Sequence, residues 1–140
     1  MADTDSSKSK ERGDLRSTPI GEMRLVRPGV IVHRLEEGIS VAAEDAEVVK
    51  QLTAELAAGQ PVVMVVDMRQ VAFAERDARD AFSEGAGGLE IGTALVTGEG
   101  FSDKLAGLFL RYSRPSRPVN VFRTESDAIA WAQTLLAEHA

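Results

Sequence analysis

Among the acidic side chains, Asp67 has the best position for binding chemistry, because it ends the apolar run of residues 61–68. A run of this length without alternating polar residues predicts a strand that is buried on both faces. In open α/β sheets, ligands bind outside the carboxyl ends of the strands, so Asp67 is a candidate site residue. An ion pair with Arg69 is the simpler role for the same carboxylate, and it is the one that we favour.

The two histidines offer no acid–base pair. His33 lies in a predicted strand, where we expect a surface or edge position, and His139 lies far from it in sequence. The chain contains no cysteine, which excludes a disulfide framework, a thiolate metal site and a cysteine nucleophile. Because no nucleophile and base pair stands out, we expect no enzymatic activity, and the sequence indicates neither a cofactor nor a metal.

Basic side chains concentrate in the stretch RYSRPSRPVNVFR, residues 111–123. Arg111, Arg114 and Arg117 follow one another at three-residue spacing, and Arg123 lies nearby. In a chain with a formal net charge of −6, four guanidiniums form a candidate surface for an acidic partner or an anionic ligand. A charged run on a loop is more often simply solvated, which is the alternative.

The composition narrows the classes of protein to consider. A chain of 140 residues with 44% hydrophobic and 27% charged residues fits one globular domain. The balance of 22 acidic against 16 basic residues disfavours nucleic acid as a partner, because that binding relies on cationic side chains. The first 22 residues lack the apolar core of a signal peptide and no later run reaches the length of a membrane helix, so we expect a cytoplasmic protein without membrane insertion.

The elements that must position these residues are expected to begin after residue 22. Residues 1–22 contain few branched aliphatic side chains, so we expect a flexible N-terminal tail there and a single domain over residues 23–140. Residues 23–26 and 30–35 flank an Arg-Pro-Gly segment. This pattern predicts a β-hairpin around a tight turn.

Helix and strand patterns then alternate along the chain. Helices are expected over residues 43–58, from residue 75 to the glycine cluster at 85–88, over residues 101–112, and after Thr124. Strands are expected over residues 61–68, 89–98 and 119–122. This order predicts an α/β fold with a mostly parallel sheet, right-handed crossovers and one antiparallel edge from the hairpin.

The same order of elements, together with the segment PVVMVVDMRQVAFAERDARDAF, resembles the STAS domain. That fold is shared by bacterial anti-sigma factor antagonists and the cytoplasmic tails of sulfate transporters. More specifically, the chain resembles a stand-alone bacterial branch of STAS-like small proteins of unknown function. Five stretches carry this likeness: residues 66–69, 76–79, 94–96, 105–118 and 122–131. The resemblance implies a mixed, mostly parallel sheet with an N-terminal β-hairpin and about four helices.

In the anti-sigma factor antagonists, a serine of a D-S-S-G motif is phosphorylated by the partner kinase at the start of the helix after the central strand. Laid on that motif, this chain has Arg76 and Asp77 where the two serines would be. The resemblance therefore implies that the phosphoacceptor is missing and that Asp77 could stand in for a permanently modified serine. An ordinary acid in the first turn of a helix is the alternative, which we favour.

We expect a non-catalytic cytoplasmic regulatory or protein-interaction module whose protein partner is unknown. Its candidate interaction or regulatory residues are Asp67, Arg76, Asp77, Arg111, Arg114 and Arg117. The alternative is a carrier for a small apolar or anionic ligand, which a sizeable apolar pocket near Asp67 and the 101–112 helix would favour. We also expect a homodimer, paired through the edge segment 23–26 or through the amphipathic 101–112 helix.

Overall fold

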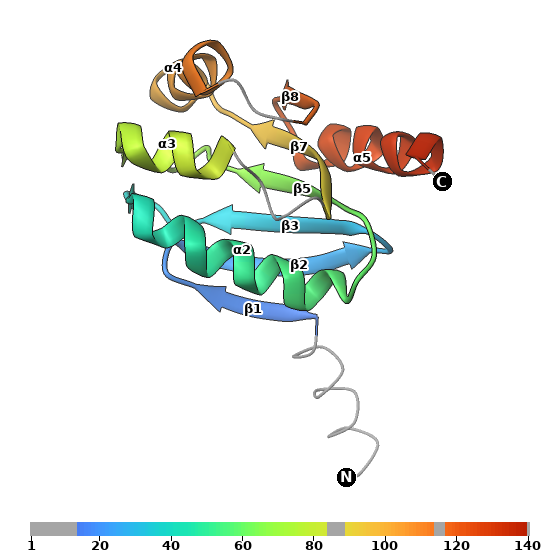
Figure 1. Cartoon of the computed structure of the whole chain (residues 1–140). Coiled ribbons are helices and arrows are strands. Elements are labelled where there is room, and N and C mark those ends of the chain that lie inside the picture. Colours follow the sequence, from blue (N-terminus) through green and yellow to red (C-terminus); the bar gives the residue numbers. More distant parts are fainter. Residues whose placement is uncertain (1–13, 84–88, 114–116, 140) are drawn as a thin grey trace, which may run out of the picture.

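The computed structural model describes residues 14–83, 89–113 and 117–139 of the chain (Figure 1). The strands are β1 Leu15–Thr18, β2 Gly21–Arg27, β3 Val30–Leu35, β4 Ser40–Val41, β5 Val62–Asp67, β6 Phe73–Ala74, β7 Glu90–Val96 and β8 Val119–Phe122. The helices are α2 Ala43–Ala57, α3 Arg76–Ser83, α4 Phe101–Leu108 and α5 Glu125–His139, and the π-helix η1 Phe109–Ser113 continues α4. Within these residues, no helix has both the length and the apolar character needed to cross a membrane.

Six strands form the main sheet in the order β1-β2-β3-β5-β7-β8, and β4 pairs with β6 in a small second sheet. Strands β1, β2 and β3 pair antiparallel, whereas β3, β5, β7 and β8 run parallel. Helices α2, α3 and α4 cover one face of the main sheet, and α5 covers the other (Figure 1). The predicted α/β fold with a mostly parallel sheet and an antiparallel hairpin is confirmed.

Strand β5 lies inside the sheet and is buried on both faces, as its unbroken apolar run predicts. Val62 and Met64 belong to the larger cluster of buried side chains under α2, α3 and α4. Val63 and Val65 belong to the cluster under α5. Because consecutive residues of a strand point to opposite faces, this one segment supplies both cores. Its last residue, Asp67, is thereby fixed at the carboxyl edge of the sheet.

The expectation of a tail over residues 1–22 is wrong for its last part. Residues 15–18 form β1, which pairs antiparallel with β2. Ile20, in the turn between these strands, is 2% exposed and joins the larger core. Pairing at a sheet edge is carried mainly by backbone hydrogen bonds, so a segment with few apolar side chains still forms a strand. Residues 1–13 lie outside the described residues.

The expected edge segment 23–26 also has a different position. It belongs to β2, which lies between β1 and β3, so the edges of the main sheet are β1 and β8. Residues 23 and 24 pair with both β1 and β3. Leu25 pairs with β3 and its N–H bonds the carbonyl oxygen of Asp14, and the register of β2 and β3 shifts between Leu25 and Arg27. This segment therefore lies inside the sheet and is not an edge strand.

Two expected helices have different ends in the structure. The 101–112 helix is regular only to Leu108 and continues as the π-helix η1. Apolar residues three and four apart do not distinguish an α-helix from a wider π turn, which is why the sequence pattern misses this change. The helix expected from residue 75 begins at Arg76 and is described to Ser83, and the glycine cluster at 85–88 lies outside the described residues.

Candidate functional site

Asp67 and Arg69 form an ion pair at the carboxyl end of β5. Nε of Arg69 donates to Oδ1 of Asp67 at 2.9 Å, and Nη2 donates to Oδ2 at 2.6 Å. Burial raises the pKa of the Asp67 carboxyl, but the hydrogen bonds and charge of Arg69, together with a hydrogen bond from Glu125, outweigh this effect and hold the pKa below its usual range. The pairing that we favoured for Asp67 is therefore present.

Further charged side chains meet at the same edge and form, with Asp67 and Arg69, the carboxyl-edge network. Arg34 of β3 donates two hydrogen bonds to Glu125 at the start of α5, both at 2.8 Å. Arg123, directly after β8, lies 3.3 Å from the carboxylate of Asp103 in α4. Each guanidinium of the network thus has a carboxylate neighbour, and Glu125 also lies 4.0 Å from Nη2 of Arg69. This matching favours a structural role for the network over a role in ligand binding.

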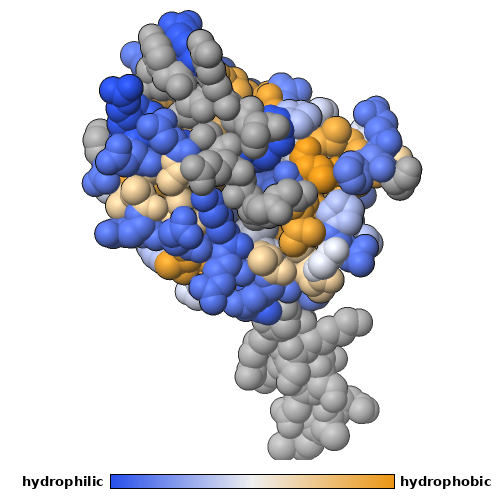
Figure 2. Space-filling view, viewed as in Figure 1, coloured by the Kyte–Doolittle hydropathy of each residue, from blue (hydrophilic) through white to orange (hydrophobic). Residues whose placement is uncertain are grey.

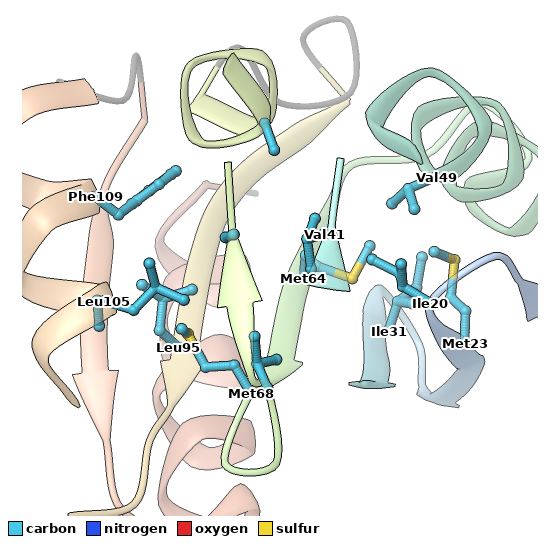
Figure 3. Close-up of a cluster of buried hydrophobic side chains, with 14 of the residues drawn as sticks. Ile20, Met23, Ile31, Val41, Val49, Met64, Met68, Leu95, Leu105 and Phe109 are labelled. Atoms are coloured by element: carbon cyan, nitrogen blue, oxygen red, sulfur yellow. The ribbon is translucent and has the colours of Figure 1, made fainter. Parts of the chain in front are cut away.

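A cavity of about 110 Å³ lies between the main sheet and the helices α2, α3 and α4. Its walls are mainly apolar, and most of their side chains belong to the larger core. In Figure 3, the labelled side chains on one side of the view are Leu95, Leu105 and Phe109, and those on the other include Val41, Val49 and Met64. The carrier alternative expects a sizeable apolar pocket near Asp67 and the 101–112 helix. Leu105 and Phe109 of that helix segment line the cavity, whereas Asp67 is not among its lining residues.

Arg117 lies beside this cavity in a buried ion pair. Its Nε lies 2.8 Å from Oε2 of Glu90 and donates to Oγ1 of Thr93 at 2.7 Å, and its Nη2 donates to the carbonyl oxygen of Phe82 at 3.0 Å. The Thr93 hydroxyl donates to the same carboxylate of Glu90. The side chains of Arg117 and Glu90 are 8% and 7% exposed. Arg117, which we expected on a basic surface, therefore has its guanidinium inside the molecule.

The structure does not gather the predicted arginines into one surface. Arg111 is exposed in η1, whereas Arg123 belongs to the carboxyl-edge network and Arg117 is buried. Arg114 lies outside the described residues. The view in Figure 2 shows a mostly hydrophilic surface with small, separate apolar patches, and the exposed large hydrophobic residues of the described chain are Val48 and Leu110.

The first turn of α3 carries the two residues that align with the phosphorylated motif. Arg76 and Asp77 are both exposed. The other side of the same helix faces the interior, where Ala78 is fully buried and Phe82 lines the cavity. Helix α3 therefore joins an exposed charged end to the cavity wall.

His33 lines the cavity from β3, and the expectation of a surface or edge position for it is wrong. The residue is 2% exposed, and its strand lies between β2 and β5. Nε2 of the ring lies 2.9 Å from Oγ1 of Thr18 in β1. Burial lowers the pKa of His33 to about 4. The alternation of strand residues was the available signal, because residues 31, 33 and 35 share one face.

The model of a family described as a domain of unknown function, DUF7793, matches residues 24–136. The chain belongs to the DUF7793 family. A comparison with curated proteins gives no match.

The DUF7793 domain is similar in structure to an uncharacterized protein of the DUF3478 family with a SpoIIAA-like fold from Shewanella loihica PV-4. The two chains share 15% sequence identity, the alignment covers 84% of this chain and 90% of the other, and the TM-score is 0.53. At this identity the likeness shows the fold alone, and it confirms the STAS-like architecture. The segment matched by the family model contains every cavity-lining residue except Ile20.

The stability of the DUF7793 domain is expected to fall as the pH decreases below 6.5, because His33 is buried in its neutral form. In the unfolded chain the ring takes up a proton near its ordinary pKa of about 6.5, whereas in the folded chain it does so near pH 4. The unfolded state therefore binds more protons in this pH window. The free energy of unfolding falls by roughly 2 kcal/mol between pH 6.5 and pH 5.

Urea denaturation of the wild type and of His33→Phe at pH 7 and pH 5 measures this contribution. The free energy of unfolding should fall less in the variant than in the wild type over the same pH interval. Carboxylates titrate in both proteins, whereas His33 titrates only in the wild type. Equal losses would contradict the assignment of this pH dependence to His33.

Proposed function

We propose that this DUF7793 domain is a non-catalytic binding module whose ligand is a small apolar molecule held between the sheet and α2, α3 and α4. The cavity of about 110 Å³ carries this proposal. An engineered cavity of roughly 150 Å³ lined by aliphatic and aromatic side chains binds benzene, so the volume found here suits a ligand of similar or slightly smaller size.

The polar groups around the cavity support a binding role rather than turnover. Glu90 and Arg117 neutralise each other, and the hydroxyl of Thr53 donates to the carbonyl oxygen of Val49 at 2.7 Å. The hydroxyl that contacts His33 belongs to Thr18 of β1, which is not among the described residues that line the cavity. This hydroxyl also bonds the carbonyl oxygen of Gly21, so it is not placed as a nucleophile facing a ligand in the cavity.

The segment that continues α4 supports the same proposal. Phe109, the first residue of the π-helix η1, forms part of the cavity wall. Short π-helical segments are rare in proteins and occur frequently at functional sites. Its position beside the cavity is therefore in keeping with a wall that is shaped for a ligand.

Benzene is expected to stabilise the wild-type chain against thermal unfolding, by about 1.4 kcal/mol at ten times its dissociation constant. Ala78→Leu, which places a larger side chain at a fully buried position of the wall, should weaken this binding at least about tenfold by filling the space. Calorimetric titration and thermal unfolding at several benzene concentrations measure both effects.

Ala130→Leu is the matched control, because Ala130 is exposed on α5 on the other face of the sheet. This variant should bind benzene like the wild type. If the wild type is not stabilised, or if Ala78→Leu binds equally well, the cavity is not a ligand site.

A regulatory role through a protein partner is the second candidate, and α3 favours it. The exposed first turn of α3 carries Arg76 and Asp77, while Ala78 and Phe82 of the same helix line the cavity. A ligand in the cavity would contact α3 and could thereby shift the position of its exposed first turn. We further propose that the protein is a cytoplasmic homodimer that associates through the edge strand β1 or through the side of η1 that exposes Leu110.

Asp77→Ser is expected to change partner binding or to create a kinase substrate, if Asp77 stands in for a phosphorylated serine. Asp77→Ala should mainly reduce stability, by about 0.3–1 kcal/mol, because an acid near a helix N-terminus interacts favourably with the helix dipole. Affinity measurements on wild type and both variants with a purified partner compare these effects. Equal affinities would leave Asp77 only its structural role.

A further inference from the structure

The contacts of the Thr18 hydroxyl favour one protonation of the neutral His33 ring. Oγ1 of Thr18 lies 3.1 Å from the carbonyl oxygen of Gly21, accepts from the backbone N–H of Ile20 at 3.2 Å, and lies 2.9 Å from Nε2 of His33. A carbonyl oxygen can only accept, so all three contacts are hydrogen bonds at once only when the single hydroxyl proton of Thr18 goes to Gly21. The remaining contact is a hydrogen bond only if Nε2 of His33 carries the proton and donates it.

The other ring nitrogen is consequently left as an acceptor. A neutral imidazole carries one proton, so Nδ1 of His33 presents a lone pair. The ring is neutral at pH 7 because burial lowers its pKa to about 4. Within the described residues, Nδ1 has no hydrogen-bonding partner. Every fully buried side-chain nitrogen or oxygen of these residues does have a partner. Nδ1 must therefore border open space, and the open space beside His33 is the cavity.

We propose that Nδ1 of His33 is the polar anchor of the cavity, and that the ligand is a small apolar molecule carrying a hydroxyl group that donates to it. This inference rests on the proposed function and names its ligand class. Nδ1 is an acceptor that faces a mainly apolar cavity, and a ligand hydroxyl supplies a donor for it.

The chemistry of the anchor disfavours other simple head groups at Nδ1, whereas Lys50 and Arg79 elsewhere in the wall are the groups that a carboxylate would meet. An ionised carboxylate only accepts hydrogen bonds, so it cannot pair with the Nδ1 lone pair. An ammonium group would have to leave water for a mainly apolar space, where the carboxylate among the described lining residues, Glu90, is already bound to Arg117. A neutral hydroxyl donates one hydrogen bond at a much smaller cost of desolvation.

Three probes test the inference on the full chain: phenol and toluene, which are nearly equal in size, and the larger anion benzoate. Calorimetric titrations of the wild type and of His33→Phe give the ratio of the toluene and phenol dissociation constants. This ratio should change in favour of toluene by about fivefold in His33→Phe, the size expected for one hydrogen bond. His139→Phe, at an exposed position of α5, is the control and should leave the ratio unchanged.

A second measurement needs no variant and covers the case in which His33→Phe does not fold. Nitrogen NMR of the wild-type imidazoles should show Nδ1 of His33 unprotonated, with a signal that moves on addition of phenol and not on addition of toluene. The signals of His139 serve as the internal reference.

The outcomes separate the two proposals. If toluene and phenol bind but neither the ratio nor the Nδ1 signal changes, the anchor is refuted and the apolar cavity stands as a binding site. Tighter binding of benzoate than of phenol would likewise overturn the hydroxyl class. If none of the probes binds, the proposed function falls and this inference falls with it.

Discussion

Replacing Glu90 by alanine is expected to lower the free energy of unfolding by about 3–5 kcal/mol. The change removes the carboxylate that lies 2.8 Å from Nε of Arg117, whose side chain is 8% exposed. A buried guanidinium that loses its counter-charge keeps its full cost of desolvation, and Thr93 loses the acceptor of its hydroxyl as well. Urea denaturation of Glu90→Ala and the wild type at pH 7 measures the difference.

Glu47→Ala provides the matched control. The carboxylate of Glu47 is 81% exposed and lies 3.8 Å from Nζ of Lys50, so its removal should change stability by less than about 0.5 kcal/mol. The double variant Glu90→Leu with Arg117→Met should recover most of the loss, because apolar side chains of similar volume replace the pair. A loss below about 1 kcal/mol in Glu90→Ala would show that water reaches the pair.

Gly21→Ala is expected to lower the free energy of unfolding by about 3 kcal/mol or more. A Cβ atom at this position would lie 2.0 Å from the carbonyl oxygen of Arg34 and 3.0 Å from Cα of Leu35. Both atoms belong to the backbone of β3, which cannot turn aside as the end of a side chain can. The hairpin of β2 and β3 must therefore separate at this point, and thermal unfolding measures the cost.

Gly107→Ala controls for the change of residue type alone. Gly107 is an exposed residue of α4, and a Cβ atom there would meet nothing within 4 Å. Alanine loses less backbone entropy on folding than glycine does, so this variant should gain about 0.5–1 kcal/mol. Similar losses in both variants would contradict the steric explanation for Gly21.

The parts of the fold that local pattern specifies were predictable from sequence. The apolar run of β5, the turn between β2 and β3, and the limits of α2 and β8 are all set by residues within a short stretch. Strand β1 was not predictable in this way, because its pairing with β2 is made by the backbone and its side chains are mostly polar. In the structure, the buried side chains of Thr18 and Ile20 connect this segment to the core.

The site was less predictable, because its contacts join residues that are distant in sequence. Asp67 and Arg69 are two positions apart and could be paired from the sequence. Arg34 and Glu125 are 91 positions apart, and no local pattern links them. The cavity itself depends on how α3 and α4 pack on the sheet, which neither helix specifies alone.

The helix that covers the second face of the sheet is the last of the described elements to be synthesised. Val30, Val32, Val63 and Val65 on that face are each at most 2% exposed once α5 is in place. A growing chain that has left the ribosome only as far as β8 carries this row of branched side chains uncovered, and such surfaces favour association between unfinished chains. The strands therefore cannot reach their stable arrangement one after another during translation, and the domain acquires its second core in a single late step, when residues 125–139 become available.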